Sequence, residues 1–202
     1  MAETIPRTLT GLRRSEALCT RCPLYLPATQ VVPGEGPEHA PLMMVGEQPG
    51  NDEDLAGHPF VGPAGRMLDR AIAEAGLDRK AIFVTNAVKH FKFEQRGKRR
   101  LHKRPNAYEI DRCKWWNDIE RALVQPKLVV ALGATAARSL TGKPVPINRL
   151  RGEVLPLDGM RKLVVTIHPS ALLRIKDSED KKRQYIGLVD DLRFCAKILR
   201  AG

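Results

Sequence analysis

The sequence predicts an α/β fold, a three-layer α/β/α sandwich with a central four-stranded, mostly parallel sheet. Four short apolar runs, each suited to a buried strand, alternate with segments in which apolar residues have helical spacing. Strands and helices that alternate in this way are typical of a parallel sheet with helices on both faces. The chain has 202 residues, of which 43% are hydrophobic, so we expect one domain that spans residues 1–202.

The first half of the chain carries two of the expected strands. A short helix near the start precedes the C-x-x-C pair of Cys19 and Cys22 and a stretch rich in proline and glycine. The first strand covers residues 42–45 and leads into a long loop with many glycines and prolines. A helix over residues 66–75 stops at Gly76, and a second strand covers residues 81–84.

The second half begins with a basic segment and then repeats the alternation of helix and strand. Asn106 and Glu109 have the spacing of a capping box, so a helix is expected to begin there and to reach residue 124. The remaining expected elements are a third strand at 128–132, a turn into a short helix at 133–137, a fourth strand at 163–167 and a last helix at 181–199.

The charge of the chain indicates a polyanionic partner. The formal net charge is +11 and the pI is about 9.8. Residues 89–104 contain eight lysines and arginines against the single acid Glu94, which is more than half of the net excess. A solvated basic loop would explain such a segment, but this concentration of charge is more typical of a surface that meets phosphate groups.

Four cysteines need an explanation. No apolar run is long enough for a membrane span and the N-terminus lacks the apolar core of a secretory signal, so we expect a cytoplasmic protein without membrane contact. Disulfides are rare in that compartment. Cys19 and Cys22 could form a redox couple or bind a metal, and the prolines that follow them favour metal. Cys113 and Cys195 stand alone, where burial as an apolar residue is an equal explanation.

Polar residues or a glycine turn follow each expected strand. They are Glu47 and Gln48, Asn86, Gly133 and His168. In open parallel sheets the ligand site forms outside the carboxyl ends of the strands. We therefore expect an acid, two amides, a glycine turn and an imidazole to meet in one crevice, although this pattern alone names no reaction.

Three segments together resemble one enzyme family. They are GEQPGNDEDLAGHPFVGPAGRMLD, VTNAVKHFKF and HPSALLR. In this order and spacing they resemble the iron–sulfur uracil-DNA glycosylases of family 4 over nearly the whole chain, which implies the uracil-DNA glycosylase-like form of the sandwich. The inserted KRRLH at residues 98–102, with Gln48 after Glu47, resembles more closely the UdgX branch, whose members become covalently attached to uracil-containing DNA.

The resemblance implies a pocket for a uracil that has been flipped out of DNA. Phe60 would stack on the base, and the Asn86 amide would pair with N3–H and O4, where cytosine presents the opposite pattern. Gly46 and Gly50 would line the same pocket. Taken alone, an isolated phenylalanine is more typical of core packing and an asparagine after a strand of a turn. Asn51 departs from the family, because relatives often carry an acid there.

The resemblance also implies the catalytic groups Glu47, Gln48, His102 and His168. His168 would donate a hydrogen bond to uracil O2 as charge builds on the leaving base, and Glu47 would stabilise the oxocarbenium-like sugar. A ring nitrogen of His102 would then attack C1′, with Glu47 fixing its tautomer, to give a covalent adduct and a single turnover. Without the resemblance, His102 in a basic run would be interpreted as a phosphate contact.

Two other functions stay open at this point. The chain could be an ordinary family-4 enzyme that releases uracil and leaves an abasic site, or an iron–sulfur DNA-binding module without chemistry. The expected partner is uracil-containing DNA, single- or double-stranded, with free uracil as the product, and we expect a monomer. The residues expected to contact DNA are Lys98, Arg99, Arg100, Lys103 and Ser170.

The resemblance implies a [4Fe-4S] cluster, which the family holds with four cysteines. Cys19, Cys22 and Cys113 match three of those positions, and the remaining one is occupied by His90. Imidazole ligates iron in Rieske centres, so we expect these four residues to hold the cluster. Cys195 lies among apolar residues of the last helix and is expected in the core.

Overall fold

The computed structural model describes residues 5–201, and the expected domain limits at residues 1 and 202 lie outside this part. A central five-stranded sheet has the order β2-β1-β5-β7-β6. Its four longer strands are all parallel. These strands are β1 (Leu42–Gly46), β2 (Ile82–Asn86), β5 (Leu128–Leu132) and β7 (Lys162–Thr166).

The sheet has a fifth strand, so the expected four-stranded sheet was one strand short. β6 (Leu155–Pro156) pairs antiparallel with β7 at the edge of the sheet. An edge strand tolerates a proline because one of its sides needs no ladder hydrogen bond. Two residues are too few to give the alternation that identifies a strand, which is why the sequence pattern missed it.

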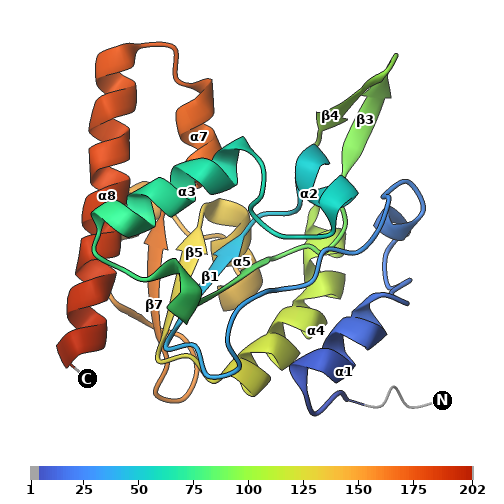
Figure 1. Ribbon diagram of the computed structural model, residues 1–202, viewed down its shortest axis with the longest axis horizontal. Helices are drawn as coiled ribbons and strands as arrows, with labels where there is room; N and C mark the ends of the chain where they lie inside the picture. Colours follow the sequence, from blue (N-terminus) through green and yellow to red (C-terminus); the bar gives the residue numbers. More distant parts are fainter. Residues whose placement is uncertain (1–4, 202) are drawn as a thin grey trace.

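Helices cover both faces of the sheet (Figure 1), which confirms the expected three-layer sandwich. One face is covered by α3 (Pro63–Glu74), α7 (Pro169–Arg174) and α8 (Ser178–Ala201), and the other by α1 (Leu9–Glu16), α4 (Ala107–Val124) and α5 (Ala134–Thr141). Side chains alternate along each strand between the two layers. Met44 and Val130 belong to the core under the first group of helices, and Met43 and Val129 to the core under the second.

Local signals explain most helix boundaries. The Asn106 side chain accepts a hydrogen bond from the Glu109 N–H (2.9 Å), and the Glu109 carboxylate accepts one from the Asn106 N–H (2.7 Å). This capping box begins α4 as expected. α3 begins earlier than expected, at Pro63, where a proline in the first turn removes an N–H that has no partner within the helix anyway.

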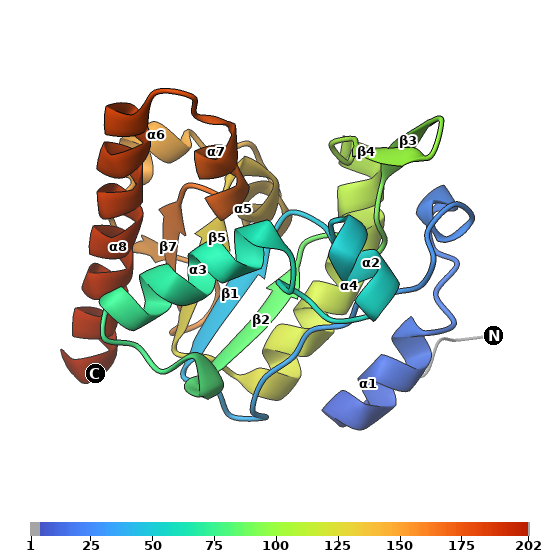
Figure 2. The same cartoon turned by 45° about the horizontal axis from the view of Figure 1, so that its top comes forward.

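The basic segment is a β-hairpin rather than a loop. It consists of β3 (Phe93–Arg96) and β4 (Arg99–His102) and pairs with no other described strand. Gly97 supplies the positive φ of +56° that its tight turn requires. Figure 2 shows the hairpin projecting from the body of the molecule near α2 (Asn51–Ala56).

Three short helices complete the secondary structure of the described residues. They are α6 (Ile147–Leu150) and the 3-10 helices η1 (Pro23–Tyr25) and η2 (Arg79–Ala81). Within residues 5–201, no helix combines the length and the apolar character that crossing a membrane requires.

Candidate active site

The carboxyl ends of the four parallel strands meet at one edge of the sheet, as expected for this architecture. A cavity of about 400 Å³ opens at this edge. Among the residues that line it are the expected site residues Glu47, Gln48, Gly50, Phe60, Asn86, His102, His168 and Ser170. Segments that lie far apart in the sequence therefore contribute to one site.

Gly46, the last residue of β1, marks the point where three of these side chains converge. A Cβ atom added there would clash with Asn86 Oδ1, would lie 2.6 Å from Phe60 Cζ and would lie 3.4 Å from His168 Nε2. The space beside Gly46 thus carries an amide on one side, an aromatic edge on another and an imidazole nitrogen on a third. A planar ring with polar edges suits that space.

The loop after β1 holds Phe60 in an uncommon backbone conformation. Its φ is +59°, a value that residues other than glycine rarely adopt and that surrounding structure must enforce. Gly65 allows this because any Cβ at that position would overlap the Phe60 carbonyl. Glu53 braces the loop by accepting hydrogen bonds from the N–H groups of Gly50 (3.0 Å) and Gly62 (2.8 Å).

His168 is held in one tautomer. Its Nδ1 accepts a hydrogen bond from the Ser170 N–H (3.1 Å) and lies 2.8 Å from the Ser170 hydroxyl oxygen. Because Nδ1 accepts, the proton of a neutral imidazole sits on Nε2, the atom that faces Gly46. Burial lowers the pKa of His168 to about 4, against the smaller opposing effect of Glu47, so the ring is neutral at pH 7.

Glu47 has three side-chain partners, two at the end of the hairpin and one in α5. Its Oε1 is 3.3 Å from His102 Nε2, and its Oε2 accepts a hydrogen bond from the Thr135 hydroxyl (2.5 Å) and lies 3.6 Å from Arg104 Nε. Burial acts to raise the pKa of Glu47, but the hydrogen bonds from His102 and Thr135 outweigh it and lower the pKa to about 2. The carboxylate is therefore ionised and held in place. Thr135, in the first turn of α5, was missed by the sequence analysis.

Gln48 attaches the base of the hairpin to the end of β1. Its Oε1 accepts a hydrogen bond from the Lys92 N–H (3.1 Å), and its Nε2 donates to the carbonyls of Lys92 (3.1 Å) and Lys103 (3.0 Å). Lys103 directly follows His102, so this amide helps to hold the imidazole beside Glu47. Gln48 was expected to be catalytic, and in the structure its side chain contacts the backbone at both ends of the hairpin that carries His102.

Arg100 has a different position from the one expected of a phosphate contact. Its guanidinium donates to Asp54 Oδ2 (2.5 Å) and to Asn51 Oδ1 (2.9 Å), both on α2. It also lies over the rings of Phe91 and Phe93, at 5.4 and 5.1 Å from their centroids. Because these internal partners occupy its donors, Arg100 anchors the hairpin to α2, and we withdraw it as a DNA contact.

Two of the expected DNA contacts are exposed on the hairpin. Lys98 lies in the turn and Arg99 begins β4, and both are exposed. Lys103 is also exposed but pairs with Glu94 at 2.5 Å. The basic hairpin therefore presents Lys98 and Arg99 most openly to a partner.

Lys89, the first residue of the basic segment, does not contribute to that surface. Its side chain is fully buried, donates to Glu120 at 2.7 Å and also contacts the Thr85 hydroxyl. Glu16 lies 4.0 Å away, and burial raises the pKa of Glu16 to about 8. Counting Lys89 with the phosphate-facing charge was wrong, because it is the internal partner of buried carboxyls.

Sequence comparison identifies the family. A model of the uracil DNA glycosylase superfamily matches residues 33–193 of this chain. The chain belongs to the uracil-DNA glycosylase superfamily. It is 38% identical over 162 residues to a type-4 uracil-DNA glycosylase of Thermotoga maritima, which covers 80% of this chain and 81% of the relative. It is 33% identical over 173 residues to a type-4 uracil-DNA glycosylase of Archaeoglobus fulgidus, with 82% and 83% covered.

Three of the four residues expected to bind the iron–sulfur cluster in this uracil-DNA glycosylase family member lie in the same part of the buried core. Cys19, Cys22 and Cys113 are all buried in the core on the side of α4. The Trp116 indole N–H donates to Cys19 Sγ (3.1 Å), and the Lys89 N–H donates to Cys113 Sγ (3.2 Å). Such hydrogen bonds to sulfur accompany iron–sulfur clusters, so the chemistry of these buried thiols fits the cofactor.

The fourth expected ligand is His90, which lies in the chain between β2 and the hairpin. His90 is buried, and its electrostatic neighbour is Asp54, on the side of α2. Within residues 5–201, no group of three or more histidine, cysteine, aspartate and glutamate side chains converges closely enough to hold a metal ion. Cys195 lies in the core on the opposite side of the sheet, as expected of a packing residue.

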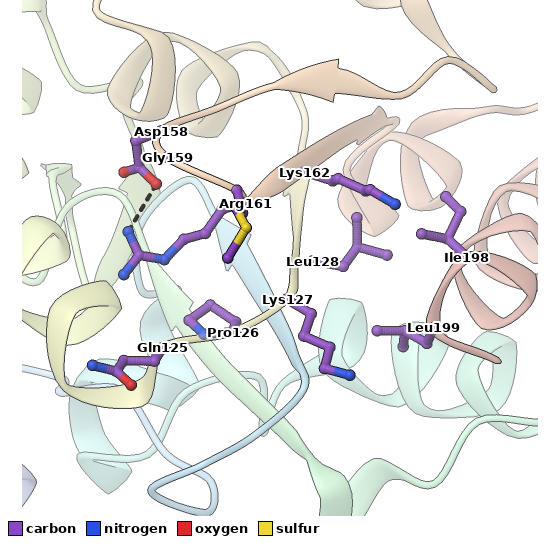
Figure 3. Close-up of a pocket in the computed structure, with 11 residues that line it drawn as sticks. Gln125, Pro126, Lys127, Leu128, Asp158, Gly159, Arg161, Lys162, Ile198 and Leu199 are labelled. Carbon is purple, nitrogen blue, oxygen red and sulfur yellow. Dashed lines mark hydrogen bonds and ion pairs between the residues drawn. The ribbon is translucent and has the colours of Figure 1, made fainter. Parts of the chain in front are cut away.

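A larger cavity, of about 510 Å³, lies at the opposite edge of the sheet in this uracil-DNA glycosylase family member (Figure 3). Its lining includes Leu128 and Lys162, which begin β5 and β7. Asp158 is its single carboxylate, and Arg161 pairs with it at 2.8 Å. The residues that line this cavity include no histidine or cysteine, so it lacks the side chains that meet in the first cavity.

Proposed function

We propose that this protein removes uracil from DNA by breaking the N-glycosidic bond, and that His102 then captures the sugar covalently. Membership of the superfamily and the type-4 relatives support the first step. The observation that carries the second is the 3.3 Å separation between His102 Nε2 and Glu47 Oε1. The hairpin delivers an imidazole to the carboxylate that faces the reacting carbon.

The uracil would enter the space beside Gly46. The Asn86 amide can accept from N3–H and donate to O4, while a cytosine would meet the opposite donor and acceptor. Phe60 offers its ring to the base, and its centroid lies 6.3 Å from that of His168 with an interplanar angle of 26°. Only a base that has left the DNA helix can reach these contacts, so they favour a flipped-out pyrimidine.

The bond would break with help on both sides. Negative charge builds on the departing uracil, and the Nε2–H of neutral His168 donates to uracil O2 without giving up its proton. Positive charge builds at C1′, and the ionised Glu47 carboxylate stabilises it. The low pKa of each group keeps both in the required protonation state.

His102 would complete the reaction in place of water. The lone pair of a ring nitrogen of His102 forms a bond to C1′. The bond between C1′ and uracil N1 breaks, and the electron pair of that bond leaves with the base. The imidazole then loses its N–H proton, and uracil takes up one proton at N1, so the proton count balances. The product is an N-glycosyl bond between histidine and the sugar, with one free uracil per protein molecule.

We also propose that Cys19, Cys22, Cys113 and His90 hold a [4Fe-4S] cluster. Two of the sulfurs already accept N–H hydrogen bonds, which supports the assignment. A bound cluster would link the N-terminal segment to α4 and to the chain between β2 and the hairpin. It would act structurally there.

Incubation with a uracil-containing oligonucleotide and a denaturing gel tests the proposal. We expect free uracil and a slow band that survives heat and SDS, and we expect the band to disappear in His102→Ser. His39→Ser is the matched control, because His39 is exposed in the loop before β1. Uracil release without the slow band would identify an ordinary turnover glycosylase, and no uracil release would leave only DNA binding.

A further inference from the structure

We propose that a second cavity beside the uracil pocket binds a backbone phosphate next to the target nucleotide, through Arg104 and Arg174. This inference rests on the proposed function and assigns a DNA contact away from the hairpin tip. The cavity measures about 370 Å³. Arg174 was not an expected DNA contact, and Arg104 was expected to meet phosphate only as one of the charges of the basic segment 89–104.

The two cavities share one wall. Glu47, His102, His168, Ser170 and Arg174 line both of them. C1′ must lie at this wall, because Glu47, His102 and His168 all act on the glycosidic bond. If the base lies in the first cavity beside Gly46, the phosphates attached to its sugar would lie on the other side of this wall, in the second cavity.

The lining of the second cavity suits a sugar and a phosphate. Ile147 and Ile167 contribute apolar surface. Arg104 and Arg174 contribute two guanidinium groups, against Glu47 as the single carboxylate of the lining. Both arginines are exposed, so they can reach a phosphate that stays at the surface.

Arg104 gives this site a link to the chemistry. Its Nε lies 3.6 Å from Glu47 Oε2 while its side chain is 76% exposed, so the pair is loose and solvated. A backbone phosphate offers Arg104 a stronger partner, because its two non-bridging oxygens can accept from both sides of the guanidinium fork. If Arg104 moved away from Glu47 to bind the phosphate, the negative charge of Glu47 would interact mainly with His102 and with the sugar cation.

Single neutral linkages test the site. We would prepare two oligonucleotides, each with one methylphosphonate, on the 5′ or the 3′ side of the deoxyuridine, and measure the single-turnover rate of uracil release. With the wild-type protein we expect one of the two linkages to slow release at least about tenfold. Arg104→Ala and Arg174→Ala should each slow uracil release from natural DNA. In each variant, the methylphosphonate that slows the wild type should slow release only about twofold.

Arg200→Ala is the matched control, since Arg200 is exposed near the far end of α8. It should keep the wild-type rate and the full methylphosphonate penalty. The inference fails if neither linkage slows the wild type, or if Arg104→Ala and Arg174→Ala retain the full penalty. Uracil release from natural DNA by the wild type separates this failure from a failure of the proposed function.

Discussion

Replacing Arg100 by alanine tests how the hairpin is attached. The Asp54 carboxylate is completely buried and the Arg100 side chain is only 16% exposed, so their 2.5 Å ion pair is largely desolvated. Removing one partner of a buried pair typically costs about 3–5 kcal/mol. Asp54 keeps a hydrogen bond from the Thr29 N–H (3.1 Å), so we expect the lower end, about 3 kcal/mol.

Urea unfolding measures this loss, and Arg99→Ala is the control. Arg99 neighbours Arg100 on β4 but is exposed, so its removal should change the free energy of unfolding by less than about 0.5 kcal/mol.

Arg100→Ala should also slow adduct formation at least about tenfold, because raising the activation free energy by about 1.4 kcal/mol through poorer positioning of the hairpin is enough for that. A double-mutant cycle with Asp54→Asn should show positive coupling. Equal stability of the two arginine variants would refute the reasoning.

Three further predictions concern the pocket and pH. Gly46→Ala should reduce uracil release at least about a hundredfold, because its Cβ would occupy the space for the base; a wild-type rate in a uracil-release assay would mean that the base binds elsewhere. Gln48→Leu should slow adduct formation more than uracil release, because the hairpin loses its attachment, and comparing the two rates by single-turnover kinetics checks this. The pKa of His168 is lowered to about 4, so the folded protein binds fewer protons than the unfolded chain between pH 6.5 and 4, and stability falls as the pH falls through this window. Glu47, with its pKa lowered to about 2, adds a loss below pH 4.5, and urea midpoints should decline less steeply in His168→Gln between pH 6.5 and 4.

Local patterns in the sequence predicted the framework of the fold. The capping box at Asn106 and Glu109 begins α4 as expected, and the polar side chains after the strands line one pocket, while Gly133 lines the neighbouring cavity. These features depend on neighbours in the chain or on the general geometry of parallel sheets, so a single sequence carries them. The roles within the pocket came from the family resemblance, since Phe60 and Asn86 have ordinary structural explanations.

Features that depend on distant partners were not predictable. Lys89 looked like part of a basic surface, but its partner Glu120 lies 31 positions away and no local pattern marks the pair. The hairpin was expected as a loop because charged residues on both faces hide the alternation of a strand. Arg100 was expected on phosphate because its partner, Asp54, is 46 positions away. Thr135 was overlooked because a threonine after a glycine turn carries no signal of its own.

The hairpin has an evolutionary consequence. It is a separate sheet inserted between β2 and α4, and it is attached to the body through Gln48 at its base and through Arg100 at α2. No strand of the central sheet pairs with the hairpin. If the proposed function holds, a lineage could therefore acquire or discard the proposed nucleophile by exchanging this one short segment together with a few residues of the loop after β1, and the strands of the central sheet would not have to change.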